Sequence, residues 1–75
     1  MNLMQEVEDI LKNDFPNSEV TVEDLTGTQD HLSVTIISER FQGLRLIQQH
    51  QLVMDSLKAK LSENLHAIKI KTITR

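Results

Sequence analysis

The sequence contains no cysteine, and this absence excludes disulfide bonds and any thiolate metal site built by this chain alone. Soft-metal chemistry would therefore need thiolates from another molecule. The sequence also lacks tryptophan and tyrosine, and its aromatic residues are two phenylalanines, Phe15 and Phe41. Both fall where a core would use them, so base stacking on aromatic side chains, which is common in proteins that bind single-stranded nucleic acid, is poorly supported.

Long apolar runs are absent as well, and the first ten residues lack the basic and then apolar order of a secretory signal. We therefore expect a cytoplasmic protein with no membrane-spanning segment. A chain of 75 residues fits one domain, residues 1–75, and has room for one hydrophobic core.

Motifs that mark catalytic sites are missing too. The sequence has no nucleophilic cysteine, no Gly-x-Ser-x-Gly elbow, no phosphate-binding glycine loop and no His-Glu-x-x-His zinc motif. Carboxylates are paired at Glu8-Asp9 and Glu23-Asp24, but adjacent residues point apart on a helix or a strand. We therefore interpret them as solvated surface residues and expect no enzymatic activity.

Charge is present but unevenly distributed along the chain. The net charge is −3, made up of −7 in residues 1–30 and +4 in residues 31–75. An anionic partner would be attracted to the second half if the fold gathers its cations on one side, and the alternative is a solubilising surface. The candidate cations are Arg40, Arg45, Lys58, Lys60, Lys69 and Lys71.

Apolar residues spaced by three and four predict a helix from about Leu3 to Asp14, which ends before Pro16. Alternating polar and β-branched residues predict strands at Glu19–Glu23 and His31–Ser38. The loop between them, from Asp24 to Asp30, contains a glycine, so an antiparallel pair is the simplest arrangement. The helical stripe consists of Met4, Val7, Ile10, Leu11 and Phe15.

From Phe41 the spacing becomes helical again. A short helix leading into a longer one, with a bend near Gln48 to Gln51, would explain why the apolar stripe drifts, and Asn64-Leu65 is a plausible stop. Alternation from His66 to Ile73 then predicts a third strand with its lysines toward solvent. The second helical stripe consists of Leu46, Ile47, His50, Val53, Met54, Leu57 and Leu61.

The order helix, strand, strand, helix, helix, strand predicts an α+β fold. In such a fold the helices cover one face of a three-stranded mixed sheet. If the last strand lies beside the first in parallel, Lys69 and Lys71 face solvent while Ile68 and Ile70 are buried, in agreement with the alternation.

Three histidines are candidate metal ligands. His50 lies on an apolar stripe, which favours a partly buried helix residue whose ring is hydrogen-bonded locally. His31 and His66 lie at the ends of expected strands, where a side chain can meet a partner. Two imidazoles do not complete a tetrahedral site, so on this pattern alone both residues could equally be ordinary surface histidines.

Spaced motifs in the second half resemble the BolA family. They are Phe41-Gln-Gly43, then Gln49-His50-Gln51-Leu52-Val53, then Leu65-His66-Ala67 before a lysine-alternating strand. The resemblance implies an αββααβ fold similar to the type II KH domain, with Phe41, Gly43 and His50 as motif positions. Gln49 and Gln51 stand where the family often has arginines, which weakens a DNA-binding function.

The same resemblance implies a partnership with a monothiol glutaredoxin, in which the two proteins and glutathione share a bridging [2Fe-2S] cluster that the isolated chain does not bind. His66 corresponds to the family's His-Ala ligand, and His31 is the loop residue able to supply the second ligand. We expect a monomer or a weak homodimer without the partner. The alternative function is a DNA-binding transcriptional regulator that uses the six cations named above.

Overall fold

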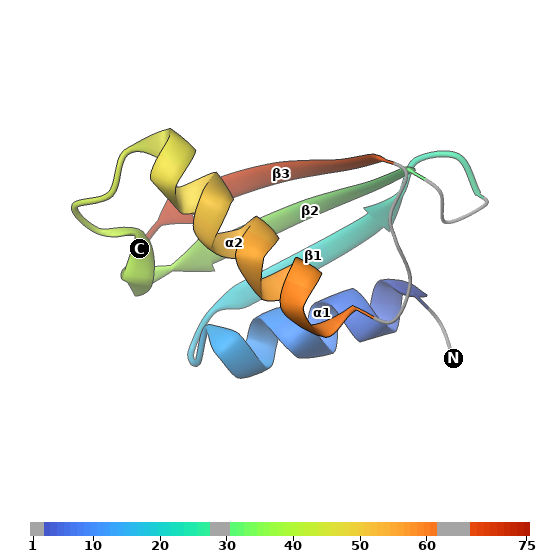
Figure 1. The fold of residues 1–75 in the computed structure, drawn as a ribbon, viewed down its shortest axis with the longest axis horizontal. Coiled ribbons are helices and arrows are strands. Elements are labelled where there is room, and N and C mark those ends of the chain that lie inside the picture. Colours follow the sequence, from blue (N-terminus) through green and yellow to red (C-terminus); the bar gives the residue numbers. More distant parts are fainter. Residues whose placement is uncertain (1–2, 28–30, 62–66) are drawn as a thin grey trace.

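A computed structural model describes residues 3–27, 31–61 and 67–75 (Figure 1). The elements follow the predicted order, with a 3-10 turn in place of the short helix, and they confirm the α+β class. They are α1 (Leu3–Asp14), β1 (Glu19–Asp24), β2 (His31–Ser38), the 3-10 turn η1 (Glu39–Phe41), α2 (Leu46–Lys60) and β3 (Ala67–Thr74).

The strands form one mixed sheet in the order β1-β2-β3. β1 runs antiparallel to β2, with Val22 opposite Val34, and β3 runs parallel to β2, with Ile70 opposite Val34. The arrangement considered from the sequence, with the last strand beside the first, is therefore not found. The chain reaches β3 by a crossover through α2, which returns it to the free edge of β2, because parallel neighbours need such a connection.

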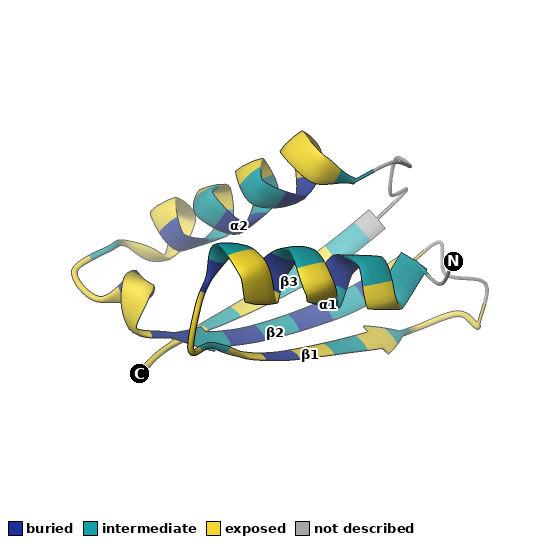
Figure 2. Ribbon diagram, turned by 90° about the horizontal axis from the view of Figure 1, so that it is seen from below, coloured by how far each residue is buried: buried dark blue, intermediate teal, exposed yellow. Residues whose placement is uncertain are grey.

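Both helices pack on the same face of the sheet (Figure 2). The alternation along β2 turns Leu32, Val34 and Ile36 toward the helices, and all three are buried. The rings of Phe15 and Phe41 lie in this core with their centroids 5.6 Å apart. The other buried apolar residues are Val7, Leu11, Val20, Val53 and Leu57.

The opposite face of the sheet, here called the open face, is covered by no helix in the described part of the chain (Figure 2). The strand registers place three rows of side chains on it. These rows are Glu23, Ser33 and Lys69; Thr21, Thr35 and Lys71; and Glu19, Ile37 and Ile73.

The second helix differs from the prediction at its start. α2 is continuous through the expected bend near Gln48 to Gln51, and the break lies earlier, in the turn where Gly43 has a φ of 77°. Leu46 and Ile47 were expected on the buried stripe, yet they are 62% and 75% exposed. The buried face carries Val53 and Leu57, as predicted, together with Gln49, which lies four residues before Val53.

The ends of the two helices depend on local backbone chemistry. Pro16 follows α1 as predicted, and Asn17 takes a φ of 64°, a left-handed conformation that asparagine tolerates. α2 ends at Lys60, earlier than expected, and the N–H of Leu61 still donates to the carbonyl of Leu57 at 2.8 Å. The predicted stop at Asn64-Leu65 lies outside the described residues.

Candidate functional site

One end of the sheet brings together residues that are far apart in the sequence. His31 is the first residue of β2, and its side chain is exposed. Because β2 and β3 are parallel, both begin at the same end, and the register places His31 opposite Ala67. This arrangement, here called the His31 end, joins the start of β2 to the residue that directly follows His66 in the sequence.

The loop beside His31 is shaped by Asp24. One carboxylate oxygen of Asp24 accepts the backbone N–H groups of Thr26 at 3.2 Å and Gly27 at 3.0 Å, and Gly27 has a φ of 80°. This is the hydrogen bonding by which aspartate stabilises turns. The N–H of Leu25 donates to the carbonyl of His31 at 2.9 Å and closes the pair of strands. Asp24 is thus a turn-forming residue, a role that the Asp-x-x-Gly spacing could have indicated.

The candidate ligands differ in what the structure says of them. His66 lies outside the described residues. His31 offers an exposed imidazole, a side chain that can bind iron or zinc through a neutral ring nitrogen. The described residues contain no group of three or more His, Cys, Asp or Glu side chains able to hold a metal ion. The described residues therefore do not form a metal site by themselves.

His50 lies away from the His31 end. It belongs to the first turns of α2, which Figure 1 places near the C-terminal end of β3. Its side chain is half-buried, as predicted. No hydrogen bond joins its ring to another residue in the part of the chain that the structure describes, so the expected local hydrogen bond is not found.

Its neighbour Gln49 is the residue that sequence reasoning missed. The amide nitrogen of Gln49 donates to the carbonyls of Leu44 at 3.0 Å and Phe41 at 3.4 Å, while its amide oxygen accepts the hydroxyl of Thr72. This buried side chain joins the turn before α2 to β3. Its spacing of four before Val53 and eight before Leu57 was the signal that it faces the core.

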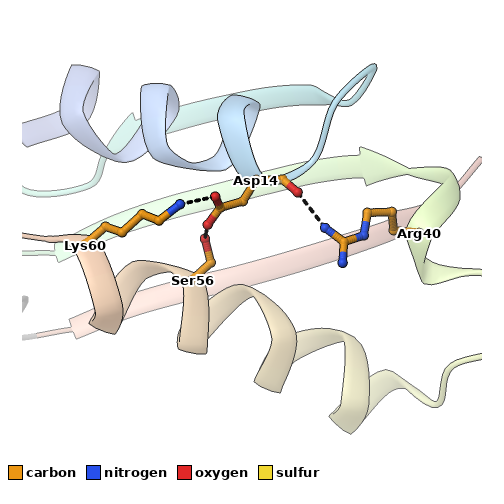
Figure 3. Close-up of polar contacts among 4 residues, drawn as sticks. All are labelled: Asp14, Arg40, Ser56 and Lys60. Carbon is orange, nitrogen blue, oxygen red and sulfur yellow. Dashed lines mark hydrogen bonds and ion pairs between the residues drawn. The ribbon is translucent and has the colours of Figure 1, made fainter.

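A second polar group joins α1, η1 and α2, and we call it the Asp14 cluster: Asp14, Arg40, Ser56 and Lys60 (Figure 3). The Ser56 hydroxyl and the Lys60 ammonium both donate to the Asp14 carboxylate. Arg40 donates to the backbone carbonyl of Asp14, and its guanidinium lies 5.0 Å from the centre of the Phe15 ring. The Lys60 hydrogen bond, followed by that of Ser56, holds the pKa of Asp14 below its ordinary value of 3.8.

The six cations proposed for nucleic-acid binding are not gathered on one face. Arg40 and Lys60 are engaged in the Asp14 cluster. Lys69 and Lys71 are exposed on the open face, whereas the helices cover the other face. The remaining two, Arg45 and Lys58, are exposed before the start and in the last turn of α2, respectively.

None of the described helices is both long enough and apolar enough to cross a membrane.

The chain resembles proteins of several organisms. A family model described as BolA-like protein matches residues 5–75. An uncharacterized protein of Rickettsia prowazekii is 47% identical over 70 residues, which cover 93% of this chain and 91% of that protein. The DNA-binding transcriptional regulator BolA of Vibrio cholerae is 44% identical over 48 residues, 64% of this chain and 45% of that protein. The matched region thus spans less than half of the Vibrio regulator.

Solved structures share the fold. BolA1 from Arabidopsis thaliana has a TM-score of 0.87 at 28% identity, with 99% of this chain and 93% of that chain covered. The BolA domain of SufE1 from the same plant has a TM-score of 0.82 at 28% identity, with 95% and 90% covered.

Proposed function

The chain belongs to the BolA-like family, and from that premise we propose that it is a non-enzymatic partner of a monothiol glutaredoxin that helps to hold a shared [2Fe-2S] cluster. The observation that carries the proposal is the parallel register of β2 and β3. It places His31 opposite Ala67, which directly follows His66 in the sequence. Two imidazoles from this chain would thus be contributed from one end of the sheet.

The absence of cysteine agrees with a shared site. His66 and His31 would supply two nitrogen ligands, and the glutaredoxin and its glutathione would supply two thiolates, which together make four. When bound, such a cluster supplies iron and sulfide for transfer or an electron for redox sensing. The imidazoles of this chain must be neutral to bind iron, so ligation weakens as the pH falls.

Reconstitution tests the proposal. The protein is mixed anaerobically with a monothiol glutaredoxin, glutathione, ferrous iron and sulfide, and the visible absorption spectrum and the mass of the complex are recorded. We expect a heterodimer whose spectrum differs from that of the glutaredoxin alone. His66→Ala should abolish this spectrum, and His31→Ala should alter it.

His50→Ala is the matched control, because it removes the third imidazole of the chain at a position away from the His31 end. It should leave the spectrum and the affinity unchanged. A His66→Ala variant with the spectrum and the affinity of the parent protein would show that the assignment is wrong.

A second candidate function is DNA binding in transcriptional regulation. It is favoured by the similarity to the Vibrio cholerae protein, which is described as a DNA-binding transcriptional regulator. The cations outside the Asp14 cluster, Arg45, Lys58, Lys69 and Lys71, would have to carry it. Contacts of cations to phosphates make affinity fall steeply with salt. Fluorescence anisotropy with duplex DNA over a range of salt concentrations tests this function, and no salt-dependent binding at micromolar protein would remove it.

A further inference from the structure

β3 forms one edge of the sheet. It pairs with β2 on one side, and in the described part of the chain no backbone hydrogen bond reaches its other side. Alternate residues of an edge strand turn their N–H and C=O groups outward, where an extended segment can pair with them. The edge of β3 therefore offers a template for an additional strand.

The N-terminal half of this edge lies clear of the helices. α2 passes over the other half, where Gln49 accepts the Thr72 hydroxyl, and Figure 1 shows α2 crossing away from β3 toward α1. The N-terminal part of β3 has no helix beside its outer edge (Figure 1). Ile68 and Ile70 are half-buried, so part of each side chain remains available for apolar contact with an added strand.

The charges on this half of the edge are of one sign. Lys69 and Lys71 alternate along β3 on the open face, and their neighbours across the sheet are the small residues Ser33 and Thr35. Both ammonium groups are exposed, and neither forms an ion pair with another described residue. The opposite edge strand, β1, carries Glu19 and Glu23 on the same face.

We propose that the β3 edge binds an extended segment of a partner protein that carries carboxylates at alternate positions, as a fourth strand of the sheet. Side chains directly opposite each other on paired strands lie about 4.5–5.5 Å apart, so alternate carboxylates would meet Lys69 and Lys71. The residues between them would contact Ile68 and Ile70. The positive charges of Lys69 and Lys71 thus indicate that the added strand is acidic.

The same lysines act against other occupants. A second copy pairing through its own β3 edge would bring ammonium groups together, and like charges directly opposite destabilise strand pairing. Lysine on an edge strand also discourages apolar strands from pairing with it. The edge thus selects for acidic segments.

Titration with a capped synthetic peptide, Glu-Val-Glu-Val-Glu-Val, tests the proposal in the full chain without iron or glutaredoxin. We expect NMR shift changes centred on β3 and slower hydrogen exchange of its outward-facing amides. Lys69→Glu with Lys71→Glu should weaken binding about tenfold or more, since two attractive pairs become repulsive. Lys58→Glu, which reverses an exposed charge on α2, is the matched control and should have little effect.

A second peptide with the same charges, N-methylated at every residue, separates strand addition from simple attraction between charges. It lacks the N–H donors on both edges and should bind about tenfold more weakly. Equal binding of the two peptides would overturn the proposal. An oligothymidylate of the same charge that displaces the peptide with equal affinity would also overturn it, because the edge would then recognise charge alone. Self-association of the protein that the peptide abolishes would overturn it too, because the edge would then bind a second copy of the chain.

The inference is independent of the proposed function. It uses the side chains of β3 and neither His31 nor His66, so His66→Ala should bind the peptide as the parent protein does. Loss of the cluster spectrum and loss of peptide binding are thus separate outcomes.

Discussion

At the scale of single residues, Gln49 shows how a polar side chain can be a core residue. Its amide is buried, and both of its ends are hydrogen-bonded, to the turn before α2 on one side and to Thr72 on the other. A buried polar group that loses its partner costs about 1–3 kcal/mol. The sequence did not predict this role, because Thr72 is distant in the chain and a polar residue on a helix is usually exposed.

We predict that Gln49→Leu destabilises the protein by about 2 kcal/mol, since the Leu44 carbonyl and the Thr72 hydroxyl lose their partner. Urea denaturation measures the free energy of unfolding. Gln51→Leu is the control, because Gln51 is exposed, and it should change stability by less than about 0.5 kcal/mol. Equal effects of the two substitutions would contradict the role assigned to Gln49.

The Asp14 cluster should make stability depend on pH at the acid end. The pKa of Asp14 is lowered in the folded state, chiefly by Lys60, so its ionised form stabilises the fold. This contribution is fully present above the ordinary pKa of 3.8 and is lost as the pH falls through the lower folded value. We expect about 1 kcal/mol, because the carboxylate is one-fifth exposed and solvent screens it.

Asp14→Asn tests this prediction. The difference in unfolding free energy between the variant and the parent should be constant above about pH 5 and should shrink below about pH 4. A double-mutant cycle with Lys60→Met isolates the coupling of the two side chains. A difference that stays constant down to pH 2 or a coupling of zero would contradict the prediction.

At the scale of elements, strong local sequence patterns were sufficient to predict the bounds of one helix and one strand. The helix from Leu3 to Asp14 and the strand from His31 to Ser38 have the predicted bounds, because a stripe before proline and a β-branched alternation are each defined by neighbouring residues. In α2 the stripe was right at Val53 and Leu57, which are buried, and wrong at its start, where Leu46 and Ile47 are exposed. The spacing alone does not show where the packing of α2 on the sheet begins, because that depends on tertiary structure.

We predict that replacing Leu46 and Ile47 together with serine changes stability by less than about 1 kcal/mol, because both side chains are largely exposed. Leu57→Ala, on the buried face of the same helix, should destabilise by about 2–4 kcal/mol. Chemical denaturation compares the two. A larger loss of stability in the double serine variant than in Leu57→Ala would show that Leu46 and Ile47 are buried, and would contradict this prediction.

At the scale of the whole molecule, the sequence predicted the α+β class and the faces of the sheet but not the order of its strands. Strand order depends on the crossover through α2, and no local pattern encodes it. The pairing of His31 with Ala67 follows from that order. The family resemblance could therefore suggest which histidines act as ligands, but the sequence could not show how the strands bring this end of the sheet together. The sequence left open whether the cations share one side of the molecule, and the fold separates them, since Arg40 and Lys60 are engaged with Asp14.

The parallel register of β2 and β3 also governs which changes in chain length the fold can absorb. Side chains alternate between the two faces of a strand, so an insertion of one residue inside Ala67–Thr74 would turn Lys69 or Lys71 toward the helices and an isoleucine toward water. An insertion ahead of Ala67 would leave that parity intact. Homologues should therefore vary in length before β3 and keep a constant residue count within it, a pattern that an alignment of related sequences would reveal.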